Sequence, residues 1–462
     1  MEYLALLKAR GNYKSSVEDL QHIAENILAK EDSPARSAVS AEKGPVAVSG
    51  WNKLNIAAGK RFGATGSARS AGGGEEAPIE LYAFSTENSG ESAPGFVLAC
   101  NDVRVGNILA IVESGDPFDL DNPFLKLFYG KLEGYIDETI AAFDNLIDKD
   151  VKRAIANIKS GGNSRVVFAN TDNWSDENGS NTVQGDNLGT GVNGAYPVLT
   201  ASWSWTNGKY AYVPVVWNQI APYNNTVNAI LNAQNNTSNN YLAGCGPVAV
   251  GQLMAYYKYP PVAGPYTFDW NAMTAYPLAN ALPSSTQMQI GNLLYYIGVQ
   301  SNTTFGTNVS LTYPWDIIEV LEQTGYHVPY YTVGSYGYPY NFEGPVDNKK
   351  RFEYYNPGYI QVSIMNNRPV LVGGFDTIGG HLWVMDGIRT MVYTETTAGG
   401  TFSSVGYVYN NLWVHCNMGL GLNYLGWYAA DCFDTNYLSL ARQAGNYSGD
   451  LRMLSEVRPI GW

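Results

Sequence analysis

The chain has 462 residues, of which 45% are hydrophobic and 15% are charged, so it has ample material for a folded core. It carries 28 Lys and Arg against 41 Asp and Glu, a net charge of −13 that does not fit a protein tracking nucleic-acid phosphates. No apolar run reaches the roughly 18 residues that a membrane-spanning helix needs. At about 100–200 residues per domain, the length predicts two to three domains.

Residues 1–160 are expected to form a small α+β unit. Ser16 and Asp19 have capping-box spacing at the start of a helix whose apolar face runs through residues 17–28. Short apolar runs then predict strands at Ile79–Phe84, Phe96–Cys100 and Ile108–Glu113. Apolar residues recurring every three or four positions from Leu132 to Ile158 predict a long helix, which Gly161 and Gly162 end.

Residues 161–195 are rich in Gly, Asn, Asp, Ser and Thr and have almost no apolar periodicity. A loop of this length is unusual inside a compact domain, so we expect a flexible interdomain linker that is open to proteolysis. Residues 196–462 form the larger part, with helices predicted first and strands afterwards, an α+β order. The helices are expected at 245–258, 286–299 and 314–324, and the strands at Val370–Gly373, Leu382–Met385, Gly406–Tyr409, Leu412–His415 and Gly426–Ala429.

Cys245 is the candidate nucleophile among the four cysteines. It lies in Gly244-Cys245-Gly246-Pro247, directly before a predicted helix whose positive dipole end would lower the thiol pKa. The other reading is a structural cysteine at a helix start. Cys100, Cys416 and Cys432 are too few and too scattered for a disulfide scaffold, and the chain has no C-x-x-C spacing that would indicate zinc.

A thiolate nucleophile needs a base, usually a histidine, and the chain has four. His22 lies on the first helix and His327 at a helix end, where each is expected to be an ordinary surface or turn residue. His381 opens a predicted strand after two glycines, and His415 ends another. Sequence chemistry favours His381 and leaves His415 open.

Two further residue types could complete an acyl-transfer site. Asn417, in a turn-rich stretch, could orient the base, and Gln219 could donate its amide to a developing oxyanion. Taken alone, each is more commonly a turn or surface residue. The triplet Asp116, Asp119 and Asp121 lacks the spacing of a calcium loop and is expected to be a solvated turn.

Taken in order, several segments resemble the streptopain family of bacterial papain-like cysteine peptidases, peptidase family C10. The resemblance spans roughly residues 196–435. It is carried by Trp217–Asn224, by Ala243–Pro260 with its Gln-x-Met, by Leu293–Val299, by Asn367–Val370 with Gly380–Gly387, and by Val414–Gly421. Residues 1–160 also resemble the family's propeptide, less specifically.

The resemblance implies a zymogen: an inhibitory propeptide-like domain at 1–160, a maturation cut in the 161–195 linker, and a papain-like cysteine peptidase domain at 196–462. It implies Cys245 as nucleophile, His381 rather than His415 as general base, Asn417 as its orienting residue and Gln219 as oxyanion donor. Protein or peptide substrates, no cofactor or metal, and the protein's own propeptide as inhibitor follow. The family also implies a secreted, cell-surface or periplasmic protein, although the first residues do not have the pattern of a signal peptide.

One departure separates this chain from the family. Members usually have Trp directly after the orienting Asn, followed by Gly-Trp-Gly, whereas this chain has Met418, Gly419, Leu420 and Gly421. The departure keeps open a catalytically impaired relative that binds protein or glycan at a surface. A second alternative retains the fold and changes the reaction to transamidation or to hydrolysis of non-peptide amides.

Overall fold

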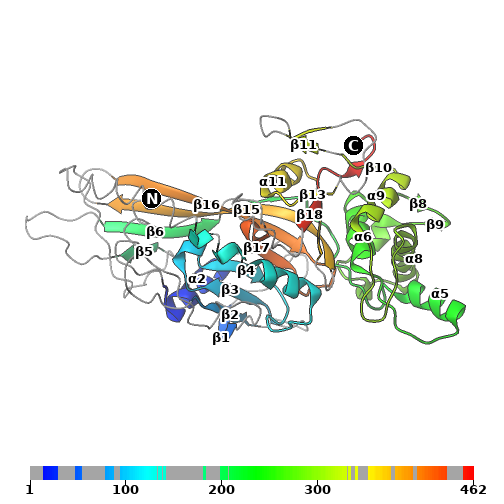
Figure 1. Cartoon of the computed structure of the whole chain (residues 1–462), viewed down its shortest axis with the longest axis horizontal. Coiled ribbons are helices and arrows are strands. Elements are labelled where there is room, and N and C mark those ends of the chain that lie inside the picture. Colours follow the sequence, from blue (N-terminus) through cyan, green and yellow to red (C-terminus); the bar gives the residue numbers. More distant parts are fainter. Residues whose placement is uncertain are drawn as a thin grey trace, which may run out of the picture.

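The computed structural model (Figure 1) is built around one large twisted sheet with helices on both faces. The structure describes residues 14–29, 47–54, 79–87, 94–132, 134–137, 139–141, 180–183, 198–205, 208–329, 331–333, 339–341, 352–375, 380–398, 403–433 and 451–462.

The sheet joins strands from both ends of the chain. Its order is β1 (Val48–Leu54), β2 (Leu81–Thr86), β3 (Phe96–Cys100), β4 (Ile108–Val112), β17 (Gly426–Ala429), β16 (Ser403–Asn417), β15 (Gly380–Ala398), β14 (Val370–Phe375), β18 (Leu451–Leu454) and β13 (Glu353–Tyr354). Beyond β14, the free edge of β15 pairs with β7 (Lys209–Tyr210) and β6 (Val198–Trp205), and β6 in turn pairs with β5 (Ser180–Val183).

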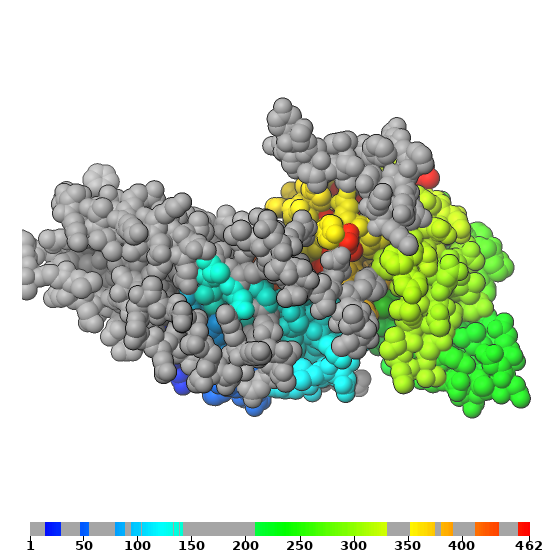
Figure 2. Space-filling model, in the orientation of Figure 1, coloured from blue at the N-terminus to red at the C-terminus, as the bar shows by residue number. Residues whose placement is uncertain are grey.

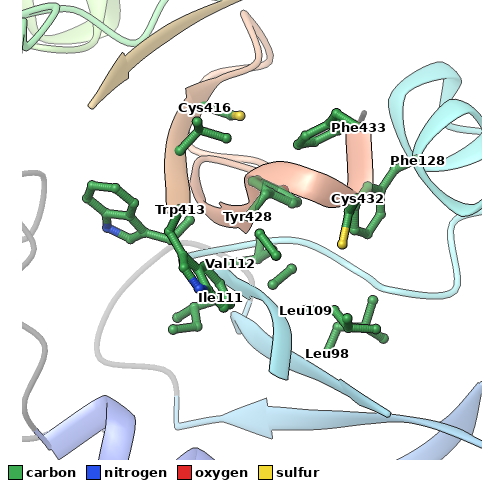
Figure 3. Packing of buried hydrophobic residues seen from close by; sticks show 14 of the residues in the cluster. Leu98, Leu109, Ile111, Val112, Phe128, Trp413, Cys416, Tyr428, Cys432 and Phe433 are labelled. Carbon is green, nitrogen blue, oxygen red and sulfur yellow. The ribbon is translucent and has the colours of Figure 1, made fainter. Parts of the chain in front are cut away.

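The pairing of β4 with β17 is the point where the N-terminal strands meet the C-terminal ones. Trp427 lies opposite Ile111, and Tyr428 lies opposite Ala110, in antiparallel register. Behind this pair, Phe128 packs on Tyr428 and on Phe433, with ring centroids 5.3 and 5.5 Å apart (Figure 3). The two regions are therefore joined by backbone hydrogen bonds and by a shared apolar core.

Strict alternation along β14 and β15 divides the core in two, because successive side chains of a strand point to opposite faces. Val370, Val372, Trp383 and Met385 face a core that contains Phe124 and the N-terminal strands. Leu371, Leu382 and Val384 face a second core that is built on the helices. The same parity places His381 on the face of Trp383.

The first face is covered by α2 (Val17–Ala29), by α11 (Pro357–Met365) and by a helix that begins at Pro123 and is continuous to Leu132. The second face carries α6 (Cys245–Tyr257), which packs on α8 (Ser284–Gln300) and α9 (Pro314–Gln323). The remaining elements are α5 (Asn225–Asn235), α7 (Trp270–Met273), β8 (Val262–Ala263), β9 (Tyr266–Thr267), β10 (Tyr326–His327), β11 (Tyr331–Val333), β12 (Pro339–Asn341), β19 (Arg458–Pro459) and the 3₁₀ turns η1 (Val103–Val105), η2 (Ala279–Ala281) and η3 (Ala430–Phe433).

The α+β class predicted from the sequence is confirmed. The capping box forms as expected, since the Asp19 amide donates to Ser16 Oγ and the Ser16 amide to Asp19 Oδ2, each at 3.1 Å. The predicted helix from Leu132 to Ile158 begins earlier than expected, at Pro123, and its part beyond residue 141 lies outside the described residues. The region expected to be a linker contains β5. Within the described part of the chain, none of the helices combines the length and apolarity needed to cross a bilayer.

Candidate active site

Cys245 is the first residue of α6, and small neighbours let other segments approach it closely. Gly244 has φ of 94°, a left-handed conformation that glycine adopts without strain. A Cβ on Gly246 would lie 2.9 Å from Thr312, and a Cβ on Gly244 would lie 3.3 Å from Ser310. The loop around residues 310–312 therefore packs directly on the helix start, and larger residues beside Cys245 would push it away.

Cys245 is half-buried and lies at the junction of α6 with β15. Burial raises the pKa of the thiol, and hydrogen bonds from the N–H groups of Leu382, Gly246 and Cys245 itself oppose that rise. The sequence predicted a lowered pKa from the helix dipole, whereas in this arrangement burial outweighs it. The contact with the Leu382 N–H brings the sulfur to the residue next to His381.

His381, at the start of β15, is 2% exposed and enclosed by aromatic rings. It stacks on Trp383, with centroids 6.0 Å apart and planes 16° apart, and it contacts Phe124, with centroids 6.3 Å apart. Its Nε2 lies 2.9 Å from the Met418 carbonyl oxygen, which can only accept, so Nε2 is the protonated nitrogen. Burial lowers the pKa of His381 to about 4, although the bond to Met418 opposes this.

Cys245 and His381 therefore approach β15 from opposite faces. Leu382 belongs to the core of α6, whereas Trp383, which stacks on His381, belongs to the core of Phe124. Among the described residues, no hydrogen bond joins the thiol to the imidazole. The Cys245 sulfur thus lies at the backbone N–H of Leu382, the residue after His381, but the side chains of Cys245 and His381 are not hydrogen-bonded to each other.

Asn417, the last residue of β16, is buried and bonded to other groups. Its Nδ2 donates to the Val215 carbonyl at 2.8 Å, and its Oδ1 accepts from the Gly419 amide at 3.4 Å. The following turn is fixed by Gly419 and Gly421, with φ of 66° and 67°. Met418, which stands where the family has Trp, is fully buried. The ring that stacks on His381 here is Trp383.

Gln219 is held beside Cys245 through its backbone. Its carbonyl accepts from the amide of Ala243, two residues before the nucleophile, at 2.9 Å. Its own amide donates to Asn218 Oδ1 at 2.7 Å. The side chain is partly exposed, next to the exposed Ile220. Gln219 therefore lies within the same wall of the site as the candidate nucleophile.

His415 has a partner that sequence reasoning missed. Its Nδ1 lies 2.6 Å from Asp386 Oδ1, both side chains are 1% exposed, and Asp386 Oδ2 accepts from the Val213 amide. Burial alone would lower the pKa of His415, but the charge and hydrogen bond of Asp386 raise it. The signal in the sequence was the Asp near the end of the predicted strand that His381 opens. Register then places Asp386 next to the strand that carries His415.

The three acidic residues 116, 119 and 121 lie in a turn. The Asp116 carboxylate accepts from the Phe118 amide at 2.9 Å, and Asp119 accepts from Tyr424 at 3.3 Å. Across the residues that the structure describes, no cluster of His, Cys, Asp or Glu has the geometry of a metal site.

The helix-and-strand region that contains these residues is similar to a known protein family. Residues 217–428 match the model of the Peptidase C10 family. Over this region, a little under half of its length, the chain is similar to the peptidase C10 family. The matched region includes all four candidate residues, Gln219, Cys245, His381 and Asn417.

Two solved structures similar to this chain come from Prevotella intermedia. A prointerpain A fragment aligns at 15% identity, over 80% of this chain and 94% of that one, with a TM-score of 0.41. The active wild-type interpain A cysteine protease aligns at 17% identity, over 55% and 95%, with a TM-score of 0.33. No curated protein matches the chain.

Proposed function

We propose that the protein is the zymogen of a secreted cysteine endopeptidase in which Cys245 is the nucleophile and His381 the general base. The observation that carries the proposal is the position of Cys245 at the N-terminus of α6, with its sulfur on the Leu382 N–H, one residue from His381. A cysteine at a helix start, next to a histidine-bearing strand, in a C10 region, is suited to acyl transfer.

The proposed reaction requires His381 to leave the Met418 carbonyl and turn toward Cys245. The imidazole then takes the thiol proton, and the thiolate attacks the peptide carbonyl carbon. The developing oxyanion accepts hydrogen bonds from the Cys245 N–H and the Gln219 side-chain amide. His381 protonates the leaving amine, and water, activated by the same imidazole, hydrolyses the thioester and regenerates the thiol. These steps use side-chain and backbone groups alone.

We propose that residues 1–160 inhibit this reaction and are removed by cleavage within 161–195, leaving the peptidase domain at 196–462. Phe124, from the N-terminal region, packs against His381 on the face away from Cys245. The β4–β17 pairing holds that region on the peptidase strands. An imidazole enclosed by Phe124 and Trp383 is not available as a base for Cys245.

In the proposed active form, Asn417 exchanges the Val215 carbonyl for His381. The two residues lie on neighbouring strands, since Asn417 pairs with Val384, three positions after His381 on β15, and the Met418 carbonyl accepts from His381. This exchange would accompany the turn of His381 from the Phe124 face of the sheet toward Cys245.

The proposal is tested by incubating the full chain with casein and a reductant, with and without a thiol-alkylating inhibitor. Casein loss and the mass of the chain are followed together. We expect inhibitor-sensitive cleavage and a new N-terminus within 161–195. A C245A chain should fold as the wild type does and cleave nothing, and casein cleavage by it would refute the assignment.

If neither casein nor the wild-type chain is cut, even after trypsin nicks the linker, the impaired relative that binds protein or glycan becomes the better account. Transfer to an amine acceptor in place of hydrolysis would indicate the transamidation alternative instead.

A further inference from the structure

A buried amide lies behind the candidate nucleophile and belongs to none of the roles assigned above. Gln252 is on α6, seven residues after Cys245 and hence on the same face of the helix two turns later. Its side chain is fully buried within an apolar helix. A buried glutamine is costly unless its polar atoms are bonded, so its presence needs an explanation.

The oxygen of this amide holds the segment that carries Gln219. Gln252 Oε1 accepts from the Trp217 backbone N–H at 2.9 Å. The Trp217 ring packs so closely on α6 that a Cβ on Gly251 would lie 3.0 Å from it. The Trp217 carbonyl in turn accepts from the Gly421 amide at 3.0 Å. Gln252 is thus the link between the nucleophile helix and the backbone two residues before Gln219.

The nitrogen of the same amide has no acceptor among the described residues, although it is buried. It faces the turn after Asn417, because a Cβ on Gly419 would lie 3.9 Å from Gln252 Nε2 and 2.9 Å from Val248. The carbonyl of the preceding residue, Met418, is here occupied by His381. When His381 turns away, a carbonyl of this turn becomes free beside an amide that has hydrogens to donate.

We propose that Gln252 is a positioning residue, which fixes the Trp217–Gln219 segment through its oxygen and the 417–421 turn through its nitrogen. The inference rests on the proposed function, since it assigns Gln252 to the placement of the oxyanion donor and of the turn next to the base. In this arrangement α6 carries the nucleophile Cys245 at its start and, two turns later, Gln252, which holds the other two segments.

The kinetic test compares matured wild type with Q252L, which has a similar volume and no polar atoms. Loss of one oxyanion donor lowers kcat by roughly 10²–10³, so Q219A is expected in that range. We expect Q252L to lower kcat about tenfold or more with little change in KM. Because part of the effect of Gln252 acts through Gln219, Q219A/Q252L should lose less activity than the product of the two single losses, whereas independent effects would multiply.

The variant Q252E keeps an oxygen that can accept from Trp217. Burial raises the pKa of such a carboxyl, and its protonated form resembles the amide. We expect its activity relative to wild type to be higher at pH 5.5 than at pH 8. Equal activity ratios at both pH values, together with multiplicative loss in Q219A/Q252L, would overturn the positioning role.

Y257F is the matched control, since the Tyr257 hydroxyl on the same helix donates a buried hydrogen bond to the Val457 carbonyl at 2.7 Å. It should leave kcat unchanged.

A readout independent of activity is hydrogen exchange of full-length Q252E, Q252L and Y257F, followed in peptides that cover residues 215–221. Loss of the acceptor in Q252L should speed exchange of the Trp217 amide tenfold or more, while Q252E and Y257F stay close to wild type. Unchanged exchange in a folded Q252L would overturn the inference.

If the wild type hydrolyses nothing, the proposed function fails, and the exchange result still decides whether Gln252 holds the Trp217–Gln219 segment. If Q252L does not fold, Q252E decides through its pH-dependent activity ratio.

Discussion

The imidazole of His381 packs against the phenyl ring of Phe124, with the two ring centroids 6.3 Å apart and the planes inclined by 56°. Phe124 lies in the region expected to be the propeptide, and His381 in the C10 region. The same phenyl ring also contacts Trp383 and Tyr428, so it belongs to the core that unites the two regions. Removal of the N-terminal region would therefore take away the Phe124 ring that packs on the His381 imidazole and expose the candidate base.

The first prediction concerns this contact. F124A should increase the rate at which the full chain matures and the rate at which Cys245 is alkylated, because truncation of a buried Phe costs about 3–5 kcal/mol. Maturation is followed by mass spectrometry and alkylation by incorporation of a labelled iodoacetamide. The control is F84A, which truncates a buried ring of β2. If F84A accelerates both rates as much as F124A does, general loosening of the N-terminal region explains the effect and the His381 contact does not.

The second prediction follows from the lowered pKa of His381. Burial holds this pKa at about 4, below its usual value of 6.5, so the unfolded chain binds the proton more readily. The stability that neutral His381 contributes is fully present above pH 6.5 and is lost as the pH falls toward 4, by about 3 kcal/mol in total. We expect urea midpoints of C245A to fall more steeply between pH 7 and 4.5 than those of C245A/H381Q. Parallel pH profiles would contradict the buried neutral imidazole.

The third prediction has the opposite sign and concerns His415. Asp386 raises the pKa of this buried imidazole, with a smaller contribution from Glu113 that Arg389 opposes. The stability from the charged pair is therefore fully present below pH 6.5 and is lost as the pH rises through the raised pKa. D386N leaves the imidazole without its carboxylate, and we expect a loss of about 3–5 kcal/mol in unfolding free energy near pH 6. In D386N, burial alone lowers the His415 pKa, so its contribution should instead weaken toward acid.

The check on this third prediction is the difference in urea midpoint between C245A and C245A/D386N, measured from pH 5.5 to pH 9. The difference should be largest at the acidic end and shrink as the pH rises. A constant difference would mean that His415 is neutral throughout, and that Asp386 acts only as the acceptor for the Val213 amide.

Local patterns were enough to predict much of the fold. The capping box of Ser16 and the apolar run of Phe96–Cys100 each predict an element from its own residues, and β3 has those bounds. The length of β15 was not predictable in this way, since its second half, Met391–Ala398, is rich in Thr and lacks an apolar face of its own. It is a strand because β16 and β6 pair with its two edges.

The candidate site shows the same division. The residue types at Cys245, His381, Gln219 and Asn417 could be selected from sequence, and the backbone brings them to adjoining segments. The His381 side chain packs on Phe124, more than 250 positions earlier in the chain, and the Asn417 side chain donates to the Val215 carbonyl. Contacts of this kind are set by tertiary packing and leave no mark on local periodicity.

The last prediction tests the junction between β4 and β17. A Cβ on Gly426 would lie 2.2 Å from the Ile111 carbonyl oxygen and 2.9 Å from Val112 Cα, both backbone atoms that cannot move without breaking the pairing. G426A should therefore separate the N-terminal strands from the peptidase strands, although it adds only one methyl group. We expect faster maturation, and faster hydrogen exchange in peptides that cover residues 108–113 and 426–429.

The matched control is G130A, in the helix that begins at Pro123. A Cβ there meets nothing within 4 Å, and alanine in place of glycine stabilises a helix interior by roughly 0.5–1 kcal/mol. G130A should thus slow maturation slightly or leave it unchanged, while G426A speeds it. If G426A matured at the wild-type rate with unchanged exchange at 108–113, the β4–β17 pairing would not be what holds the N-terminal region in place. The inhibition would then have to reside in the packing around Phe124 and Phe128 alone.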